Sequence, residues 1–153
     1  MSDDDFRTRE QEYALRVFEK INPLIPKDEQ AEKDEAKKKW RKAYGSLAHK
    51  LPVLIRTAGL SQALAFVKAR NKAGTPQQTL LRDLEAVLRQ SGALTGDDTL
   101  VERSRSAHFE EYMRLTEGAL EALLWFKRFA QSELKVQSGA DKTDLEEHAD
   151  AGT

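Results

Sequence analysis

Apolar residues recur along this chain at spacings of three, four and seven, the pattern of amphipathic helices. The first such segment can be capped by Asp4 or Asp5 and is stopped by Pro23 and Pro26. Its apolar face is predicted to comprise Phe6, Tyr13, Ala14, Val17, Phe18 and Ile21. No segment shows the strict alternation of a half-buried strand, so the pattern predicts an all-α fold.

The middle of the chain predicts three more pieces of helix. One runs from about residue 28 to 49, and Pro52 is expected to break or kink it. A short apolar piece over 53–58 ends at Gly59, and another helix follows from 61 to about 71. The predicted buried face of the 28–49 helix comprises Ala36, Trp40, Ala43, Tyr44 and Leu47.

The remaining helices have clear start signals. Thr75 can cap a helix that reaches Gln90, with Pro76 in its first position and Gln78 completing a capping box. A short helix over about 97–105 can start from an Asp or Thr cap, and the longest helix is predicted over 107–136. That helix is apolar on nearly every side between 119 and 130, which is typical of the central helix of a bundle. Its aromatic residues are predicted to fill the core, or to leave one or two as anchors for a partner: Trp125, Phe126 and Phe129.

These segments predict a compact bundle of about six helices with a long apolar C-terminal helix. Residues 1–137 are expected to form a single domain, and residues 138–153 a flexible acidic tail without a periodic apolar face. The chain has no cysteine, an acidic start and no apolar run of about 18 residues. These features favour a cytoplasmic protein and predict neither secretion nor a membrane span.

Charge is distributed very unevenly along the chain. Residues 33–72 carry 11 basic and 2 acidic side chains, a net charge of +9, whereas the flanking segments carry −4 and −6. At about 100° per residue, Lys38, Arg41 and Lys42 are predicted to lie opposite the buried face, as an outward cationic stripe. Such a stripe can be a solvated face, but the lack of acidic partners at three- or four-residue spacing across residues 36–72 favours a site for a polyanion. The other candidate cations are Lys50, Arg56, Lys68, Arg70 and Lys72.

Catalytic chemistry finds no support in the sequence. The histidines, His49, His108 and His148, lack ligand-like spacing, so we expect no metal site and no cofactor. Adjacent carboxylates, as at Glu110 and Glu111, point to different faces of a helix. No phosphate-binding loop, nucleophile elbow or HExxH helix is present, so the chain is predicted not to be an enzyme.

Two separated blocks of sequence carry a family resemblance. They comprise Tyr44-Gly45, His49-Lys50-Leu51-Pro52, Ile55, Gly59-Leu60 and Gln62–Phe66, and then Glu111-Tyr112, Thr116, Ala119-Leu120 and Trp125–Ala130. Together they resemble the small subunit of the type III-B (Cmr) CRISPR effector complex over roughly residues 5–135. The resemblance implies a non-catalytic helical bundle that stacks head to tail with copies of itself, beside the backbone and large subunits, and contacts crRNA and target RNA.

Two alternatives of other classes stay open from the residues alone. One is a DNA-binding regulator with a helix-turn-helix whose recognition helix spans 61–72, although its apolar content looks too buried for a groove reader. The other is a protein adaptor whose basic face meets an acidic protein surface. Sequence-specific duplex binding would indicate the first, and the absence of RNA protection in the assembled complex would indicate the second.

Overall fold

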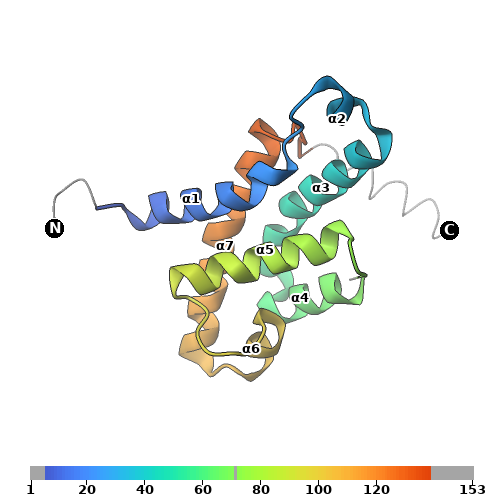
Figure 1. Ribbon diagram of the computed structural model, residues 1–153. Helices are drawn as coiled ribbons and strands as arrows, with labels where there is room; N and C mark the ends of the chain where they lie inside the picture. Colours follow the sequence, from blue (N-terminus) through green and yellow to red (C-terminus); the bar gives the residue numbers. More distant parts are fainter. Residues whose placement is uncertain (1–5, 71, 139–153) are drawn as a thin grey trace.

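The computed structural model describes residues 6–70 and 72–138, which form a compact helical bundle (Figure 1). The α-helices are α1 (Arg9–Ile21), α2 (Glu29–Lys33), α3 (Glu35–Ala58), α4 (Leu60–Ala69), α5 (Pro76–Ser91), α6 (Leu100–Ser106) and α7 (Phe109–Ser132), with a 3-10 turn, η2 (Asn22–Leu24). No strand occurs in either described range, so the predicted all-α class is confirmed, with seven α-helices instead of about six. The domain boundary at residue 137 stays a prediction, and the proposed tail lies outside the described residues from 139 onward.

Helix α1 starts later than predicted, because a better cap follows the aspartates. The Thr8 hydroxyl accepts a hydrogen bond from the Gln11 backbone N–H at 3.1 Å, and the Gln11 side chain accepts one from the Thr8 N–H at 2.8 Å. This reciprocal capping box starts the helix at Arg9, so the prediction of an Asp4 or Asp5 cap is wrong. Phe6 therefore precedes the helix and is 82% exposed instead of buried.

The predicted 28–49 helix is divided in two by Asp34. This residue is extended, and its carboxylate accepts hydrogen bonds from the Ala36 and Lys37 backbone N–H groups at 3.1 and 3.2 Å. An aspartate that satisfies free N–H groups in this way favours a helix start over a helix interior. Helix α3 then continues through Pro52 to Ala58, so of the predicted break or kink at the proline the break is wrong, whereas Gly59, at φ +91°, ends the helix as expected.

The later helix starts follow the sequence signals closely. Thr75 caps α5 by accepting a hydrogen bond from the Gln78 N–H at 3.3 Å, although the Gln78 side chain accepts from the Gly74 N–H instead of completing a capping box. Thr99 caps α6 in a full capping box with Glu102. Helix α7 is shorter than predicted, since it ends at Ser132 and not near residue 136.

The chain beyond α7 folds over α3. We call residues 133–136 the C-terminal segment; its Leu134 and Val136 are buried. The Val136 side chain lies directly over Gly45, where an added Cβ would stand 2.6 Å from the Val136 Cβ. The buried His49 imidazole also makes a hydrogen bond through Nε2 to the Val136 carbonyl oxygen, at 3.0 Å. Glycine at position 45 thus permits this close crossing.

The core lies where α1, α3, α5 and α7 meet, and α7 passes behind α1 and α5 in Figure 1. Its largest fully buried side chains include Tyr44, Leu84, Leu115 and Phe126. A partly buried polar contact links α3 and α5 in this region: the Tyr44 hydroxyl donates a hydrogen bond to the Asp83 carboxylate at 2.7 Å. Burial raises the pKa of Asp83, and burial together with the Asp83 charge raises the pKa of Tyr44 well above its ordinary value.

Candidate nucleic-acid interface

The first turns of α3 expose a dense group of lysines. We call Lys37, Lys38, Lys39 and Lys42 the lysine ridge; all four side chains are exposed. Residues 35–39 are all exposed, and the first buried residue of α3 is Arg41. This end of α3 therefore projects from the bundle, and the Asp34 cap fixes where it starts.

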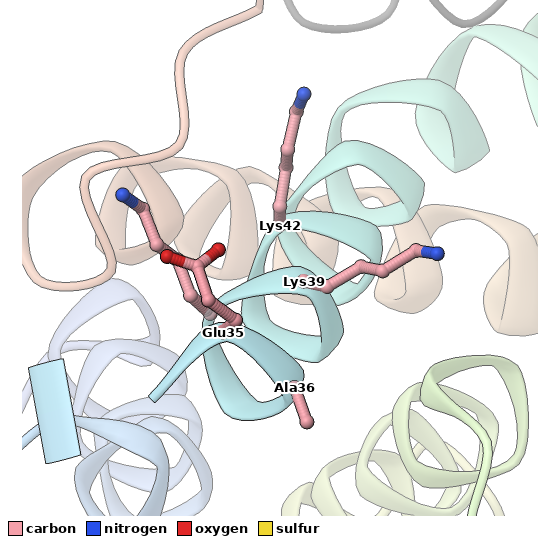
Figure 2. A pocket seen from close by; sticks show the side chains of 5 residues that line it. Glu35, Ala36, Lys39 and Lys42 are labelled. Carbon is pink, nitrogen blue, oxygen red and sulfur yellow. The ribbon is translucent and has the colours of Figure 1, made fainter. Parts of the chain in front are cut away.

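The ridge is a convex surface with a shallow depression beside it. A surface depression of about 410 Å³ is lined by Glu35, Ala36, Lys38, Lys39 and Lys42. Figure 2 shows Lys39 and Lys42 extending away from α3 in different directions, with the Glu35 carboxylate on the side of the helix away from Lys39. Ammonium groups that diverge in this way suit an extended polyanion better than a small ligand that needs convergent groups.

The ridge lysines lack acidic partners in the described residues. The ion pairs found in residues 6–70 and 72–138 all involve arginines outside α3 and α4, and the shortest joins Arg103 to Glu111 at 2.6 Å. An unpaired, exposed ammonium group keeps its full charge available to a partner, and no ion pair has to be broken first. The four ridge positions therefore form a concentrated positive field on one end of one helix.

Arg41 is not part of the outward stripe, which corrects the sequence prediction. Its side chain is only 8% exposed, and its Nη2 donates a long hydrogen bond, 3.4 Å, to the Ala31 carbonyl oxygen of α2. The prediction took Ala36 as part of the buried face, but Ala36 lies in the projecting end and is exposed, so the true buried face is rotated toward Arg41. Lys38 and Lys42 are exposed as predicted.

The other predicted cations do not join the ridge as one surface. Lys50 is partly exposed and lies on the same line of α3 as Lys39, about 16 Å farther along the helix. Arg56 is exposed about 27 Å from Lys38 along the same helix, near its C-terminal end. The ridge and these two residues therefore mark out α3 as a basic helix whose densest charge is at its start.

The cations of α4 and the following loop are separated from each other. Lys68 lies near Glu102 of α6, whose pKa is lowered mainly by hydrogen bonds from Thr99, with a smaller contribution from the Lys68 charge. Arg70 stacks on the Phe66 ring, its guanidinium carbon 3.8 Å from the ring centroid. At helical spacing Lys68 and Arg70 face opposite sides of α4, and the exposed Lys72 belongs to the turn before α5.

Sequence reasoning missed an exposed apolar line on α7. Phe109 is 77% exposed, Met113 and Leu124 are each 41% exposed, and Leu120 is partly exposed between them. The spacings of four, seven and four place these residues on one helical face, so the periodicity was visible, but it does not say which of two apolar faces is covered. Of the aromatic residues weighed as anchors, Phe126 is fully buried, while Trp125 and Phe129 are only partly exposed.

His49 and Glu111, two of the side chains considered as catalytic candidates, are held by contacts within the fold. His49 is buried against the C-terminal segment, and His108 precedes the first turn of α7, while His148 lies outside the described residues. Glu111 is held by Arg103, which also reaches Asp98. No group of three or more histidine, aspartate or glutamate side chains that could hold a metal occurs within the described ranges. Nor does any helix in those ranges have the length and apolar character that a bilayer crossing requires.

The fold and the ridge define a small all-α protein with a strongly basic surface. Residues 9–133 match the family described as CRISPR-associated protein (Cas_Cmr5). The chain is 41% identical over 126 residues to the CRISPR system Cmr subunit Cmr5 of Thermus thermophilus, a match covering 82% of this chain and 96% of that protein. A crystal structure of a CRISPR-associated Cmr5 family protein, also from Thermus thermophilus, superposes with a TM-score of 0.65 at 39% identity, covering 86% of this chain and all of the other. The chain belongs to the Cmr5 family, so the resemblance to the small subunit of the type III-B (Cmr) complex is confirmed.

Proposed function

We propose that this Cmr5-family chain is a non-catalytic small subunit of a cytoplasmic type III-B CRISPR ribonucleoprotein that acts in antiviral defence. In this proposal the lysine ridge contacts crRNA and target RNA, and copies of the chain stack head to tail in an inner filament beside the backbone and large subunits. The observation that carries the RNA contact is the group of four exposed lysines at the projecting start of α3, which lack ion pairs among the described residues.

The chemistry of the ridge favours a phosphate backbone over a base. Each lysine supplies a mobile point charge, whereas base readout needs fixed donors and acceptors such as the fork of an arginine. The predicted stripe loses its one arginine, because Arg41 is buried. The ridge is therefore expected to bind RNA without regard to sequence, as a subunit must if the guide RNA differs from one complex to the next.

Affinity per copy is expected to be low. The ridge offers at most four phosphate contacts. The binding free energy gained from releasing counterions at each contact falls as the salt concentration rises. Several copies held in line by the other subunits would contact one RNA strand together. The high effective concentration of the remaining contacts would then account for most of the overall affinity. Stacking and RNA contact are thus complementary parts of the same proposal.

The outer face of α7 supports the protein contacts. Phe109, Met113 and Leu124 expose apolar surface along one helix, and a large exposed apolar side chain is costly in water unless a partner covers it. This face carries a different chemistry from the ridge, so one subunit can meet protein and RNA at once.

The RNA contact is tested by reversing charge on the ridge. Lys38→Glu/Lys42→Glu should reduce ultraviolet cross-linking of the subunit to RNA in the reconstituted complex by about tenfold, and lower the salt dependence of RNA binding by about 1.4 in log–log slope. The matched control is Arg105→Glu/Arg114→Glu, which makes the same charge change at exposed positions of α6 and α7. Helix α6 and helix α2, which precedes the ridge, lie at opposite ends of the molecule in Figure 1. Equal cross-linking in both variants would overturn the ridge proposal and favour the adaptor alternative.

The protein contact is tested on α7. Phe109→Ser/Met113→Ser should lower recovery of the subunit with the tagged backbone subunit, while leaving its helical content unchanged. Val53→Ser is the control, because Val53 is an exposed apolar residue of α3. Full recovery of the α7 variant would mean that this face is not an assembly surface.

A further inference from the structure

The chain continues past the fold with a strongly acidic sequence. Residues 139–153 contain five acids and one lysine, a side-chain net charge of −4. The family match ends at residue 133, so this acidic segment lies beyond what the family shares. Its charge is opposite to that of the lysine ridge, where Lys37, Lys38, Lys39 and Lys42 are exposed.

The structure fixes where the chain is last anchored before the acidic segment. Val136 packs on Gly45 of α3, and its carbonyl oxygen is 3.0 Å from His49 Nε2. Its backbone N–H also donates to the Ala130 carbonyl oxygen at 2.9 Å, which ties this point to α7. The chain is thus anchored to the middle of α3 by packing and by hydrogen bonds, only three residues before position 139.

This anchor lies on the ridge side of α3. Lys38, Lys42, Gly45 and His49 are spaced by four, three and four residues, so they lie along one face of the helix. At 1.5 Å per residue, Lys42 is about 5 Å and Lys38 about 10 Å from Gly45 along the helix axis. Fifteen residues can extend up to about 50 Å, so the acidic segment can reach every ridge lysine with slack.

We propose that the acidic segment, residues 139–153, docks on the lysine ridge of its own chain. Tethering at such short range gives an effective concentration of about 1 mM or more, so a few weak contacts between carboxylates and ammonium groups keep the ridge partly occupied. The segment then competes with RNA for the ridge, a consequence that rests on the function proposed above, whereas the docking itself does not. A long RNA that contacts many subunits at once displaces the acidic segment, whereas a short polyanion that contacts a single subunit does not.

The docking is tested by zero-length cross-linking of the full chain. A carbodiimide joins a lysine ammonium group to a carboxylate as an amide, with loss of water, only where the two groups touch. Mass spectrometry should find links from Lys38, Lys39 or Lys42 to Asp141, Asp144, Glu146, Glu147 or Asp150, and they should decrease at 0.5 M salt. The exposed Lys68 on α4 serves as the internal control and should give at least fivefold fewer links.

Two results of this experiment would overturn the docking. Links spread equally over Lys68 and the ridge would show an undirected segment. In a mixture of 15N-labelled and unlabelled protein, links that join the two isotopes would show that the segment docks on another copy instead of its own chain.

RNA competition gives the second readout. Replacing the five acids, Asp141→Asn/Asp144→Asn/Glu146→Gln/Glu147→Gln/Asp150→Asn, should strengthen binding of a 12-nucleotide oligouridylate by about threefold to tenfold at low salt. The control neutralises five exposed glutamates on the fold, Glu10, Glu19, Glu29, Glu110 and Glu117, each to Gln. If both variants gained the same affinity for the oligouridylate, the gain would be explained by net charge alone, and the proposed competition would be overturned. If no variant binds the oligouridylate, the RNA contact of the isolated subunit fails, and the cross-links alone decide the docking.

Discussion

Helices α3 and α7 have the same length, 24 residues, and pack against each other, yet they expose surfaces of opposite character. The projecting start of α3 exposes lysines, whereas the outer face of α7 exposes Phe109, Met113 and Leu124. The inner faces are alike, since Tyr44 of α3 and Phe126 of α7 are both fully buried. The two helices thus share one core and offer different chemistry to two kinds of partner.

The difference follows from what covers each helix. Helix α7 contacts α1, α3 and α5, whereas the first turns of α3 contact the short α2 and, through the Trp40 indole N–H, the Gly74 carbonyl oxygen before α5. A helix end with few neighbours buries little apolar surface, so lysines there displace no core contact. Substitutions in the core are therefore expected to lower stability with little effect on the two surfaces. Substitutions on the surfaces are expected to change binding with little effect on stability.

The largest effect should come from the inner face of α7. Phe126→Ala removes a fully buried ring and should lower the free energy of unfolding by about 3–5 kcal/mol, because a cavity remains where the ring was. Leu124→Ala, two positions earlier on the exposed face, should cost below about 1 kcal/mol. Urea unfolding followed by circular dichroism measures both. Similar losses would show that the two faces of α7 are not distinct.

The crossing of α3 by the C-terminal segment should give the next effect. Gly45→Ala places a Cβ within 2.6–2.8 Å of the Val136 side chain, so the C-terminal segment must shift, at a cost of about 1–3 kcal/mol. Val136→Gly in the same chain should relieve most of this cost, because it removes the Val136 Cβ, 2.6 Å from the new Cβ, together with both methyl groups. A double-mutant cycle in urea measures the coupling, and additive losses would contradict a direct contact.

The Tyr44–Asp83 contact makes the core sensitive to pH. Burial raises the pKa of folded Asp83 above its unfolded value, so the stability that this group contributes is full at low pH and is lost as pH rises through the folded pKa. Asp83→Asn keeps an oxygen acceptor for Tyr44 and removes the charge. The stability of the variant relative to the wild type should therefore rise as pH increases from pH 4 to pH 7. A constant difference in urea midpoint across this range would contradict a partly buried Asp83 that ionises with a raised pKa.

Much of the fold could be predicted from local sequence signals, and the errors share a cause. Thr75 and Gly59 act where the sequence placed them, and Thr99 is the cap among the Asp and Thr candidates for its helix, because caps and left-handed glycines depend on nearby atoms only. The predicted break at Pro52 is wrong, because a mid-helix proline removes one hydrogen bond without necessarily ending the helix, and Pro52 is buried within α3. Covered and uncovered apolar faces look the same in sequence, which is why the exposure of Phe109 was missed.

The site was predicted only in part, because its charge is visible in the sequence but its orientation depends on neighbouring helices. The charge segregation located the correct helix, and Lys38 and Lys42 are exposed as expected. The orientation of α3 depends on α2, which packs on one side of its start and takes Arg41 out of solvent. A helical wheel centred on residues from the projecting end, such as Ala36, could not show this, because no neighbour defines a buried side there.

The smallest effects should separate two neighbours in sequence, Arg41 and Lys42. Arg41→Ala removes a buried side chain and its hydrogen bond to the Ala31 carbonyl oxygen, and should cost about 1 kcal/mol of stability. Lys42→Ala should change stability by below about 0.5 kcal/mol, because its side chain is exposed. In RNA cross-linking of the assembled complex the order should reverse, with the loss at Lys42 exceeding that at Arg41. If Arg41→Ala instead abolished cross-linking at full stability, the predicted outward stripe would be the better description of α3, and the burial of Arg41 would not hold in the complex.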